Sequence, residues 1–272
     1  MIEAAAATAT RSAFGEDWST VRVLVRRELV RFFRERSRVV GALLQPMIFW
    51  FVIGSGLSGT FALPGARHVD YREYFYPGVV LMVVLFTAIF TTMSVIEDRH
   101  AGFLQGVLVA PGSRAAVVVG KSLGAATVAF VQSGLFLLLA PFAGFSLTQI
   151  DWPLLLLALG LASLGLCLVG FGVAWWLDST SGYHVVMSVV LLPMWILSGA
   201  MFPAAGGGWL AIIERLNPMS YAVSLVRRAL YAGHPPVGTA MVTDHALWDL
   251  AVLALFALVC GVWATALVRR RR

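Results

Sequence analysis

Six long apolar stretches divide this 272-residue chain and constrain its fold more than any other feature. A helix that crosses the hydrocarbon core of a bilayer needs about 20 consecutive apolar residues. Because lipid offers no hydrogen bonds to the backbone, each crossing segment is expected to be helical. The sequence therefore predicts an all-α membrane domain over 39–268, with six transmembrane helices at roughly 39–60, 78–96, 115–145, 153–177, 183–203 and 247–268.

The third span is longer than one crossing needs. We expect it to extend beyond the bilayer, to tilt, or to break near Pro141. The fourth span is rich in small residues, which let helices approach closely either within one subunit or across a dimer. These small residues are Gly160, Ser163, Gly165, Gly170 and Gly172.

Composition agrees with a membrane protein. Charged residues make up 12% of the chain and hydrophobic residues 59%, whereas about a quarter of the residues in a soluble domain are charged. Cys167 and Cys260 each lie inside an apolar stretch. We therefore expect both to be packing residues, with no disulfide framework and no metal site.

The distribution of Lys and Arg sets the expected orientation, because cytoplasmic connections are enriched in these residues. If both termini lie on one side, that side holds fifteen of the 20 basic residues. Both termini, including the basic C-terminus 269–272, are therefore predicted to be cytoplasmic. The connection 97–114 then also faces the cytoplasm, and the long connection 204–246 faces outward.

Two patterns precede the first span. Residues 1–17 are polar and rich in Ala and Thr, so we expect them to be loose and not to act as a cleaved secretory signal. In residues 18–38 most apolar side chains fall on one arc of a helix, and Arg27, Arg31 and Arg34 fall opposite. This predicts an interfacial amphipathic helix whose three arginines are accessible from the cytoplasm.

The connection 97–114 is too polar to span lipid and too apolar to be a plain linker. It begins with Glu97, Asp98 and Arg99. Its apolar residues have the spacing of one face of a short helix: Phe103, Leu104, Val107 and Leu108. Two interpretations of this face stay open, a helix lying on lipid headgroups or a docking surface for a cytoplasmic partner.

The outer connection 204–246 is not a simple loop. Residues 209–216 are apolar but too short to cross, and a second helical stretch follows as far as Tyr231. Short helices that dip into the outer leaflet fit this pattern, provided that protein or water covers them. Arg227 and Arg228 on the second stretch are either solvated charges or contacts for a substrate.

Aromatic residues precede two of the spans. Tyr71, Tyr74, Phe75 and Tyr76 come before the second span, and Trp152 comes before the fourth. Such residues are typical of the membrane–water interface, so the sequence predicts that they form an outer aromatic belt.

No span carries an ionisable residue near its middle. Lys121 and His184 lie near inner ends, and Asp249 lies near an outer end. Ion-coupled transporters typically use intramembrane acidic, His or Lys side chains as relays. If this chain moves a solute, another polypeptide is therefore expected to supply the energy.

Two local motifs suggest chemistry that the sequence does not support. Gly120-Lys121-Ser122 is similar to the end of a phosphate-binding loop, but the first glycine of that loop would fall at Ala115. We therefore expect Lys121 to be an interfacial residue that extends toward the cytoplasm. Gly56-Leu57-Ser58-Gly59 is similar to a motif of rhomboid intramembrane proteases, but its candidate base His184 is expected about 30 Å away.

Four segments, in this order, resemble the permease subunits of type-2 ABC exporters. They are Phe75-Tyr76-Pro77-Gly78, the connection 97–114, Leu197-Ser198-Gly199-Ala200-Met201-Phe202-Pro203, and Asn217-Pro218-Met219-Ser220-Tyr221 followed by Arg227 or Arg228. The resemblance implies a homodimer in a bacterial inner membrane that works with two copies of a separate ABC ATPase. ATP and Mg would bind to that ATPase, so this chain would hold no cofactor and no catalytic residue.

The resemblance also implies roles for individual residues. The helix 18–38 and the connection 97–114 would rest on the ATPase, with the connection as the coupling helix, and the outer helices 209–231 would form an external gate. The implied coupling residues are Glu97, Asp98, Arg99, Gly102, Phe103, Leu104, Val107, Leu108 and Pro111. The implied gate residues are Asn217, Pro218, Tyr221, Arg227 and Arg228.

The function implied by the resemblance is ATP-driven export of an amphipathic or lipid-linked substrate, such as a drug, a lipid or a glycan. A membrane scaffold that recruits a cytoplasmic partner without transport is the main alternative. An intramembrane serine protease built on Ser58 is a further alternative.

Overall fold

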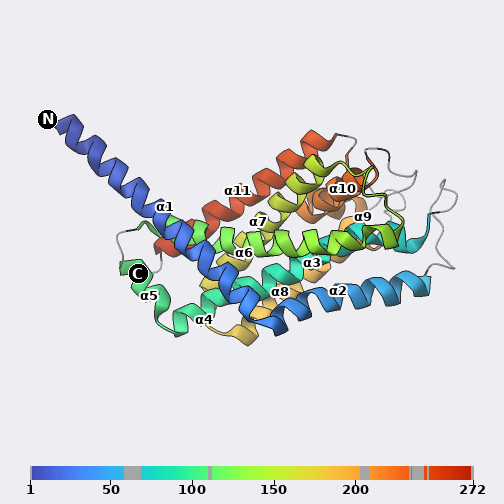
Figure 1. Cartoon of the computed structure of the whole chain (residues 1–272), viewed down its shortest axis with the longest axis horizontal. Helices are drawn as coiled ribbons and strands as arrows, with labels where there is room; N and C mark the ends of the chain where they lie inside the picture. The colour runs from blue at the N-terminus through green and yellow to red at the C-terminus, as the bar shows by residue number, and fades with distance from the viewer. Residues whose placement is uncertain are drawn as a thin grey trace.

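The computed structural model describes residues 2–57, 69–109, 112–202, 209–232, 234, 242–243 and 245–270, with side chains described from residue 15 onward except at 33 and 38. Within these ranges all regular elements are helical (Figure 1). They are α1 (Ile2–Arg34), α2 (Arg36–Leu57), α3 (Tyr71–Thr92), α4 (Ser94–His100), α5 (Phe103–Val109), α6 (Arg114–Phe136), η1 (Leu137–Ala143), α7 (Trp152–Trp176), α8 (Thr180–Trp195), η2 (Ile196–Ala200), α9 (Trp209–Leu216), α10 (Pro218–Leu230) and α11 (Ala246–Arg270).

The prediction of six transmembrane helices is confirmed. Six helical segments are long and apolar enough to cross a membrane: Val39–Leu57, Tyr71–His100, Arg114–Ala143, Trp152–Trp176, Thr180–Ala200 and Ala246–Arg270. The second begins earlier than expected, because the Asp70 side chain caps the N-terminus of α3 and Pro77 is accommodated inside the helix. In the third, α6 passes into the 3-10 helix η1 that contains Pro141, and Gly144 ends it with a φ of 99°.

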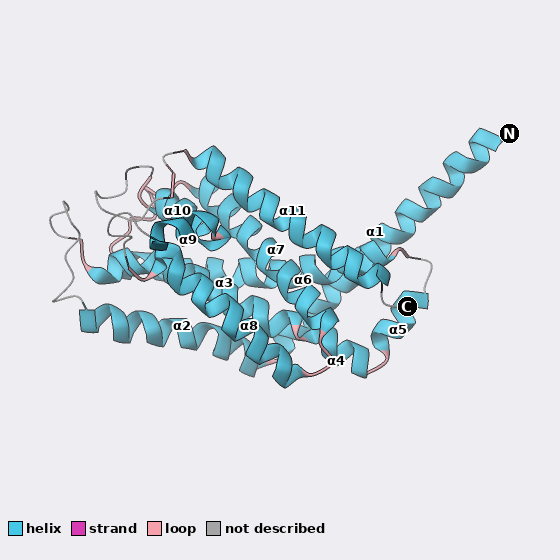
Figure 2. Cartoon of the chain, turned by 180° about the vertical axis from the view of Figure 1, so that it is seen from behind, coloured by secondary structure: helices cyan, strands magenta, loops and turns pink. Residues whose placement is uncertain are grey.

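The spans surround α3, which is almost completely buried, whereas most residues of α2 and α11 are not buried. In both views α4, α5 and the C-terminus of α11 lie at one end of the bundle, and α9 and α10 lie at the other (Figures 1 and 2). We call these the α4–α5 end and the α9–α10 end.

The predicted outer aromatic belt is wrong for the residues that precede the second span. Tyr71, Tyr74, Phe75 and Tyr76 are fully buried in the protein. Three hydroxyls donate to backbone carbonyls, from Tyr71 to Met201 at 2.9 Å, from Tyr74 to Gly199 at 2.9 Å and from Tyr76 to Phe136 at 2.8 Å. Buried tyrosines need such partners, and the three acceptors lie in or directly beside the irregular helices η1 and η2.

The small residues of the fourth span serve packing within the subunit at three positions. A Cβ atom added at Gly165, Gly170 or Gly172 would lie within 2.8 Å of a side-chain atom, respectively of Phe256, Thr92 and Trp263. These glycines therefore let α7 approach α3 and α11 closely. Both cysteines are buried, as packing residues would be.

The N-terminal segment differs from expectation. Residues 2–17, predicted to be loose, form the first half of helix α1, which extends away from the bundle in Figure 1. The run Ala4–Ala7 explains this difference, because alanine has the highest intrinsic helix propensity.

Candidate functional site

Helix α1 crosses α6 at close range near the α4–α5 end. A Cβ atom added at Gly120 would lie 3.0 Å from Cβ of Leu24, and one at Gly124 would lie 2.8 Å from Cβ of Glu28. Two glycines four residues apart lie on the same face of a helix, so α6 presents a smooth face to α1. At this crossing helix α1 therefore packs directly against α6.

This packing corrects the predicted faces of the N-terminal helix. Among the described side chains of α1, the buried ones are Val21, Leu24, Glu28 and Phe32, whereas Trp18 is 63% exposed. Arg27 and Arg31 are half-buried against α4, and Arg34 is exposed. The prediction that these arginines lie on the solvent-facing side of the helix was wrong, because Arg27 and Arg31 donate hydrogen bonds to acidic residues of α4 rather than to water.

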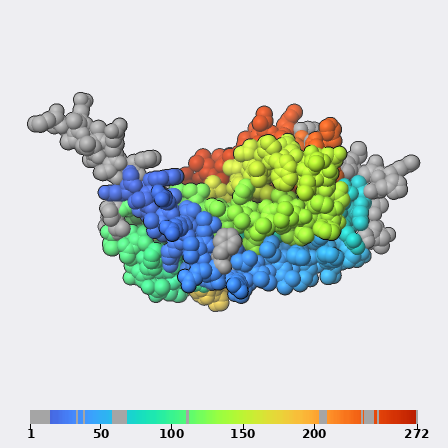
Figure 3. Space-filling model, in the orientation of Figure 1, coloured from blue at the N-terminus to red at the C-terminus, as the bar shows by residue number. Residues whose placement is uncertain are grey.

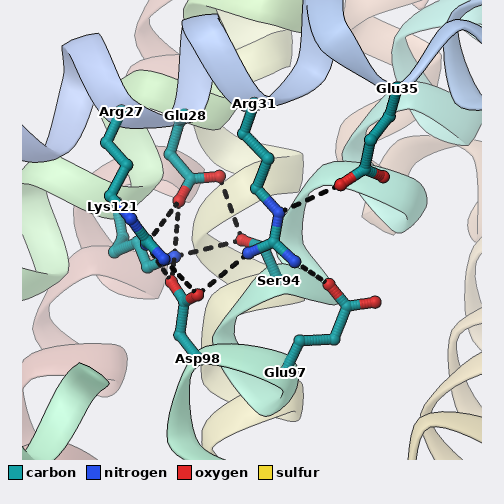
Figure 4. Close-up of polar contacts among 8 residues, drawn as sticks. All are labelled: Arg27, Glu28, Arg31, Glu35, Ser94, Glu97, Asp98 and Lys121. Atoms are coloured by element: carbon teal, nitrogen blue, oxygen red, sulfur yellow. Dashed lines mark hydrogen bonds and ion pairs between the residues drawn. The ribbon is translucent and has the colours of Figure 1, made fainter. Parts of the chain in front are cut away.

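Eight polar side chains meet where α1, α4 and α6 come together, and we call this cluster the charged junction (Figure 4). Its members are Arg27, Glu28, Arg31, Glu35, Ser94, Glu97, Asp98 and Lys121. The space-filling view shows α1 lying over this end of the bundle, beside α4 and α5 (Figure 3).

Asp98 is the centre of the charged junction. Its side chain is 2% exposed and accepts two hydrogen bonds from Arg27, one of them 2.7 Å long. It also accepts from Arg31 at 2.9 Å and from the ammonium group of Lys121. Three cations from two helices thus converge on one buried carboxylate, which the predicted coupling role of Asp98 did not anticipate.

Lys121 is buried rather than extended toward the cytoplasm. Its side chain is 1% exposed, and Nζ donates to Glu28 at 2.5 Å and to Ser94 at 3.1 Å. Ser94 in turn donates to the second oxygen of Glu28 at 3.0 Å. The expectation of a snorkelling lysine failed because Glu28 and Asp98 supply an alternative to water inside the protein.

Arg31 extends the junction to its solvent-facing rim. It pairs with Glu97 and, through Nε at 3.2 Å, with Glu35. The hydrogen bond from Arg27 to Asp98 raises the pKa of the Arg27 guanidinium, and for Arg31 the carboxylates outweigh the effect of burial, so its pKa is raised too. Both arginines therefore stay charged at any physiological pH.

Arg99, a predicted coupling residue, binds the end of another span. It donates to the backbone carbonyls of Trp175 at 3.0 Å and Ala174 at 2.9 Å and also to that of Leu177. It pairs with Asp178 at 3.2 Å. A cation at a helix C-terminus is favoured by the helix dipole, so Arg99 fastens α4 to the end of α7.

The apolar face of α5 is turned mostly toward its own chain. Leu104 is 2% exposed and belongs to the core, and Phe103, Val107 and Leu108 pack against it. The exposed residues of α5 are instead Gln105, Gly106 and Val109. The predicted docking face thus differs from the exposed face, because the same periodicity also suits packing on the subunit itself.

Phe103 links α5 to α1. The guanidinium carbon of Arg27 lies 3.7 Å from the centre of the Phe103 ring, a cation–π contact. Next to this contact a groove of ≈ 430 Å³ runs between α1 and α5, with Val23, Phe103 and Val107 among its lining residues. Gly102, the residue directly before α5, has a φ of 74°. Pro111, the last predicted coupling residue, lies outside the described residues.

The segment after α5 is also tied to α1. The Ser113 amide donates to Asp17 at 2.6 Å, and a Cβ atom added at Gly112 would lie 2.6 Å from the hydroxyl of Thr20. Helix α1 therefore contacts the chain on both sides of α5.

At the α9–α10 end, three of the four family-like segments converge on the bend in the fifth span. Gly199 has a φ of 73° inside η2, and its carbonyl accepts from Tyr74 and, at 3.1 Å, from Arg227. Trp195 donates to the carbonyl of Gly78 at 2.7 Å. The motifs around Gly78, Gly199 and Arg227 thus form one packed unit, although Pro203 lies outside the described residues.

The two arginines of α10 are not solvated charges. Arg227 is fully buried, and its guanidinium lies 4.5 Å from the ring centre of Tyr74. Arg228 is partly buried and donates to the carbonyl of Thr243 at 2.8 Å. Both side chains bind the protein itself because α10 is covered by α3, α7 and α11.

The other predicted gate residues shape the start of α10. Asn217 accepts from the Met219 amide at 3.0 Å and donates to the carbonyl of Met194 at 2.6 Å, and Pro218 occupies the first turn. Tyr221 donates to the carbonyl of Arg215 at 2.7 Å. These residues join α9 and α10 to the fifth span.

Sequence reasoning missed Glu28, Ser94 and Lys121 as members of a site. A signal was present at Lys121, since it is the single charged residue in the otherwise apolar stretch 115–150, and such charges are generally paired. Ser58, the nucleophile of the serine protease hypothesis, lies outside the described residues.

Comparison with known proteins covers most of the chain. The profile of the family described as ABC-2 type transporter matches residues 19–231. Nodulation protein J of Rhizobium leguminosarum bv. trifolii is 27% identical over 86% of this chain and 87% of its own length. The daunorubicin resistance ABC transporter permease protein DrrB1 of Streptomyces coeruleorubidus is 25% identical over 90% of this chain and 83% of its own.

A third relative is longer than this chain. The probable multidrug ABC transporter permease YbhR of Escherichia coli (strain K12) is 25% identical over 75% of this chain, but over only 54% of its own length. The match of the family profile extends from α1 through α10 and so includes both the charged junction and the bend at Gly199. The chain therefore belongs to the ABC-2 type transporter family, as a multi-pass membrane permease.

Proposed function

We propose that this chain is the membrane-spanning subunit of an ATP-driven exporter of amphipathic or lipid-linked solutes, such as drugs, lipids or glycans, working as a homodimer with two copies of a separate ABC ATPase. In this proposal ATP and Mg bind to the ATPase, and the chain itself catalyses no reaction. It lies in a bacterial inner membrane with both termini and the α4–α5 end in the cytoplasm, in line with its distribution of Lys and Arg.

The observation that carries the coupling role is the charged junction. Arg27 contacts both Asp98 on α4 and Phe103 on α5, and Lys121 joins α6 to both α1 and α4. A buried ion network with directional hydrogen bonds resists separation, because pulling one partner away leaves a charge unpaired. A push on α5 would therefore displace α1, α4 and α6 together.

Through Arg99, the same push would reach α7. A motor can drive a conformational change only through different affinities for the two states. We place the surface that the ATPase binds on the exposed residues of α5 and on the neighbouring part of α1, with the charged junction behind it as the transmitting element. The residues around Gly199 and Arg227 at the other end serve as the external gate.

The test replaces Val109 of α5, which is 87% exposed, by aspartate. Because the position is already in solvent, the fold should survive, whereas a charge in a desolvated interface is costly. We expect V109D to lose copurification of the ATPase and to abolish daunorubicin efflux from cells, daunorubicin being the probe suggested by the DrrB1 relative.

The matched control is Leu216→Asp at the opposite end of the molecule, where the side chain is 79% exposed. This variant should retain the ATPase. Full retention of the ATPase by V109D, or equal loss in both variants, would exclude docking at α5. Stable binding of an ATPase without movement of any tested solute would favour the scaffold alternative.

A further inference from the structure

A long apolar groove on the flank of the bundle is separate from both the charged junction and the bend at Gly199. It has a volume of ≈ 710 Å³ and is formed by three spans, α6, α7 and α11. That volume lies within the range of about 300–1,000 Å³ that is typical of sites for small ligands. Because all three helices are membrane spans, the groove is offered to the lipid phase.

The groove has one polar end. Arg269 lines it at the α4–α5 end, and Ser122 and Thr265 follow within its lining. The remaining lining residues are apolar or glycine, among them Leu161, Leu164 and Leu258. The polar residues of the lining thus lie toward the α4–α5 end, with the cation at the end and the two hydroxyl groups farther in among apolar side chains, and only hydrocarbon lines the groove beyond them, as suits the headgroup, linkage and acyl chain of a phospholipid.

The length of the groove matches one leaflet. Its lining on α11 runs from Ala254 to Arg269, and at 1.5 Å per residue this stretch is about 22 Å long. Half the thickness of a bilayer with its headgroups is about 20–22 Å. Arg269 at the end of the span would therefore stand at headgroup depth, with Ala254 near the bilayer midplane.

Ser122 adds an independent observation. The residue is 0% exposed, and its Oγ meets no hydrogen-bond partner among the described residues. A hydroxyl left without a partner in an apolar site is costly. Since Ser122 lines the groove, an ester or glycerol oxygen of a lipid that displaces the neighbouring apolar side chains would supply that partner.

We propose that this groove binds one anionic membrane phospholipid, with an acyl chain along α6, α7 and α11, an ester oxygen beside Ser122 and the phosphate against Arg269. The leaflet is the one at the α4–α5 end. The positive charge of Arg269 selects an anionic headgroup, and the apolar length selects a full acyl chain over a free phosphate ion. The site does not depend on the transport role, since it uses the lipid-facing side of the bundle.

The test is native mass spectrometry of the purified full chain after titration with phosphatidylglycerol or with phosphatidylcholine of the same chain length. The wild type should retain one phosphatidylglycerol per chain in preference to phosphatidylcholine. R269Q should weaken that preference about fivefold, the change typical of one basic residue at an anionic membrane surface. The matched control is R270Q, since Arg270 is exposed on the same turn but does not line the groove.

A second pair of variants tests the apolar part. Ala266 lines the groove and is exposed, so A266F should fill the groove and remove retained lipid of both kinds. Val259 is 57% exposed on the same helix outside the groove, so V259F should leave retention unchanged. Equal retention of the two lipids by the wild type, equal effects of R269Q and R270Q, or a copurifying polypeptide that crosslinks to the groove would overturn the proposal.

Discussion

At the scale of single residues, Asp98 determines the state of the charged junction, since it accepts from Arg27, Arg31 and Lys121. A buried ion costs several kcal/mol of desolvation that only good partners offset. The three basic side chains are therefore not interchangeable surface charges, and Lys121 in particular is held at 1% exposure by two carboxylates.

Lys121→Met should destabilise the protein by about 3–5 kcal/mol, because it removes the close cation from the buried Glu28 and leaves it the hydroxyl of Ser94 and the more distant Arg27, at 3.9 Å. The double variant Lys121→Met/Glu28→Gln should recover part of this loss, since no unpaired charge then remains at that position. Thermal unfolding of the purified proteins measures both effects. Additive losses in the double variant would contradict a coupled buried pair.

At the scale of elements, the crossing of α1 over α6 depends on the absence of side chains at two glycines. Gly120 and Gly124 bring the two helices so close that an added Cβ would meet Leu24 or Glu28. The charged junction lies beside this crossing, and its short hydrogen-bonding distances are available only while the helices stay in register. Packing and electrostatics thus support each other here.

Gly124→Ala should destabilise the protein by about 1–3 kcal/mol through overpacking and should make α1 more accessible to proteolysis. The control is Gly134→Ala in the same helix, where an added Cβ meets nothing within 4 Å, and which should be neutral or slightly stabilising. Unfolding midpoints together with limited proteolysis distinguish the two. Equal behaviour of both variants would argue against a close crossing.

Particular residues show what can be predicted from sequence at this scale. The spans were predicted because hydropathy depends only on local composition, and a break near Pro141 was one of the three expectations for the third span. The faces of α1 and α5 were not, because helical periodicity says which residues share a side but not what covers it. Arg27 and Arg227 could equally have met water, and only the assembled bundle supplies Asp98 to the first and Gly199 to the second.

At the scale of the whole molecule, the charged junction and the bend at Gly199 belong to opposite ends of the bundle, the α4–α5 end and the α9–α10 end (Figure 1), and the almost wholly buried α3 is one of the spans of that bundle. Arg99 caps the C-terminus of α7, and Arg114 donates to the carbonyls of Val268 and Arg269 at the end of α11. Hydrogen bonds from two arginines therefore connect the α4–α5 end to the ends of two spans. Such connections suit an end that transmits force.

The proposed orientation predicts opposite labelling of the two ends. In intact cells a membrane-impermeant thiol reagent should not reach Arg34→Cys, an exposed position near the end of α1. The same reagent should label Leu216→Cys in α9. Native Cys167 and Cys260 are buried, but they should be replaced by alanine as a precaution. Labelling of the first position from outside would reverse the orientation.

The wide spacing of the junction's partners along the chain has a consequence for biosynthesis. Glu28 and Lys121 are 93 residues apart, and Arg27 and Asp98 are 71 apart. While the ribosome is still making the second span, α1 has none of these partners from α4 or α6, and its charges must remain hydrated at the bilayer surface. Seating of the N-terminal helix is therefore a late event in maturation, completed only once the third span has entered the membrane.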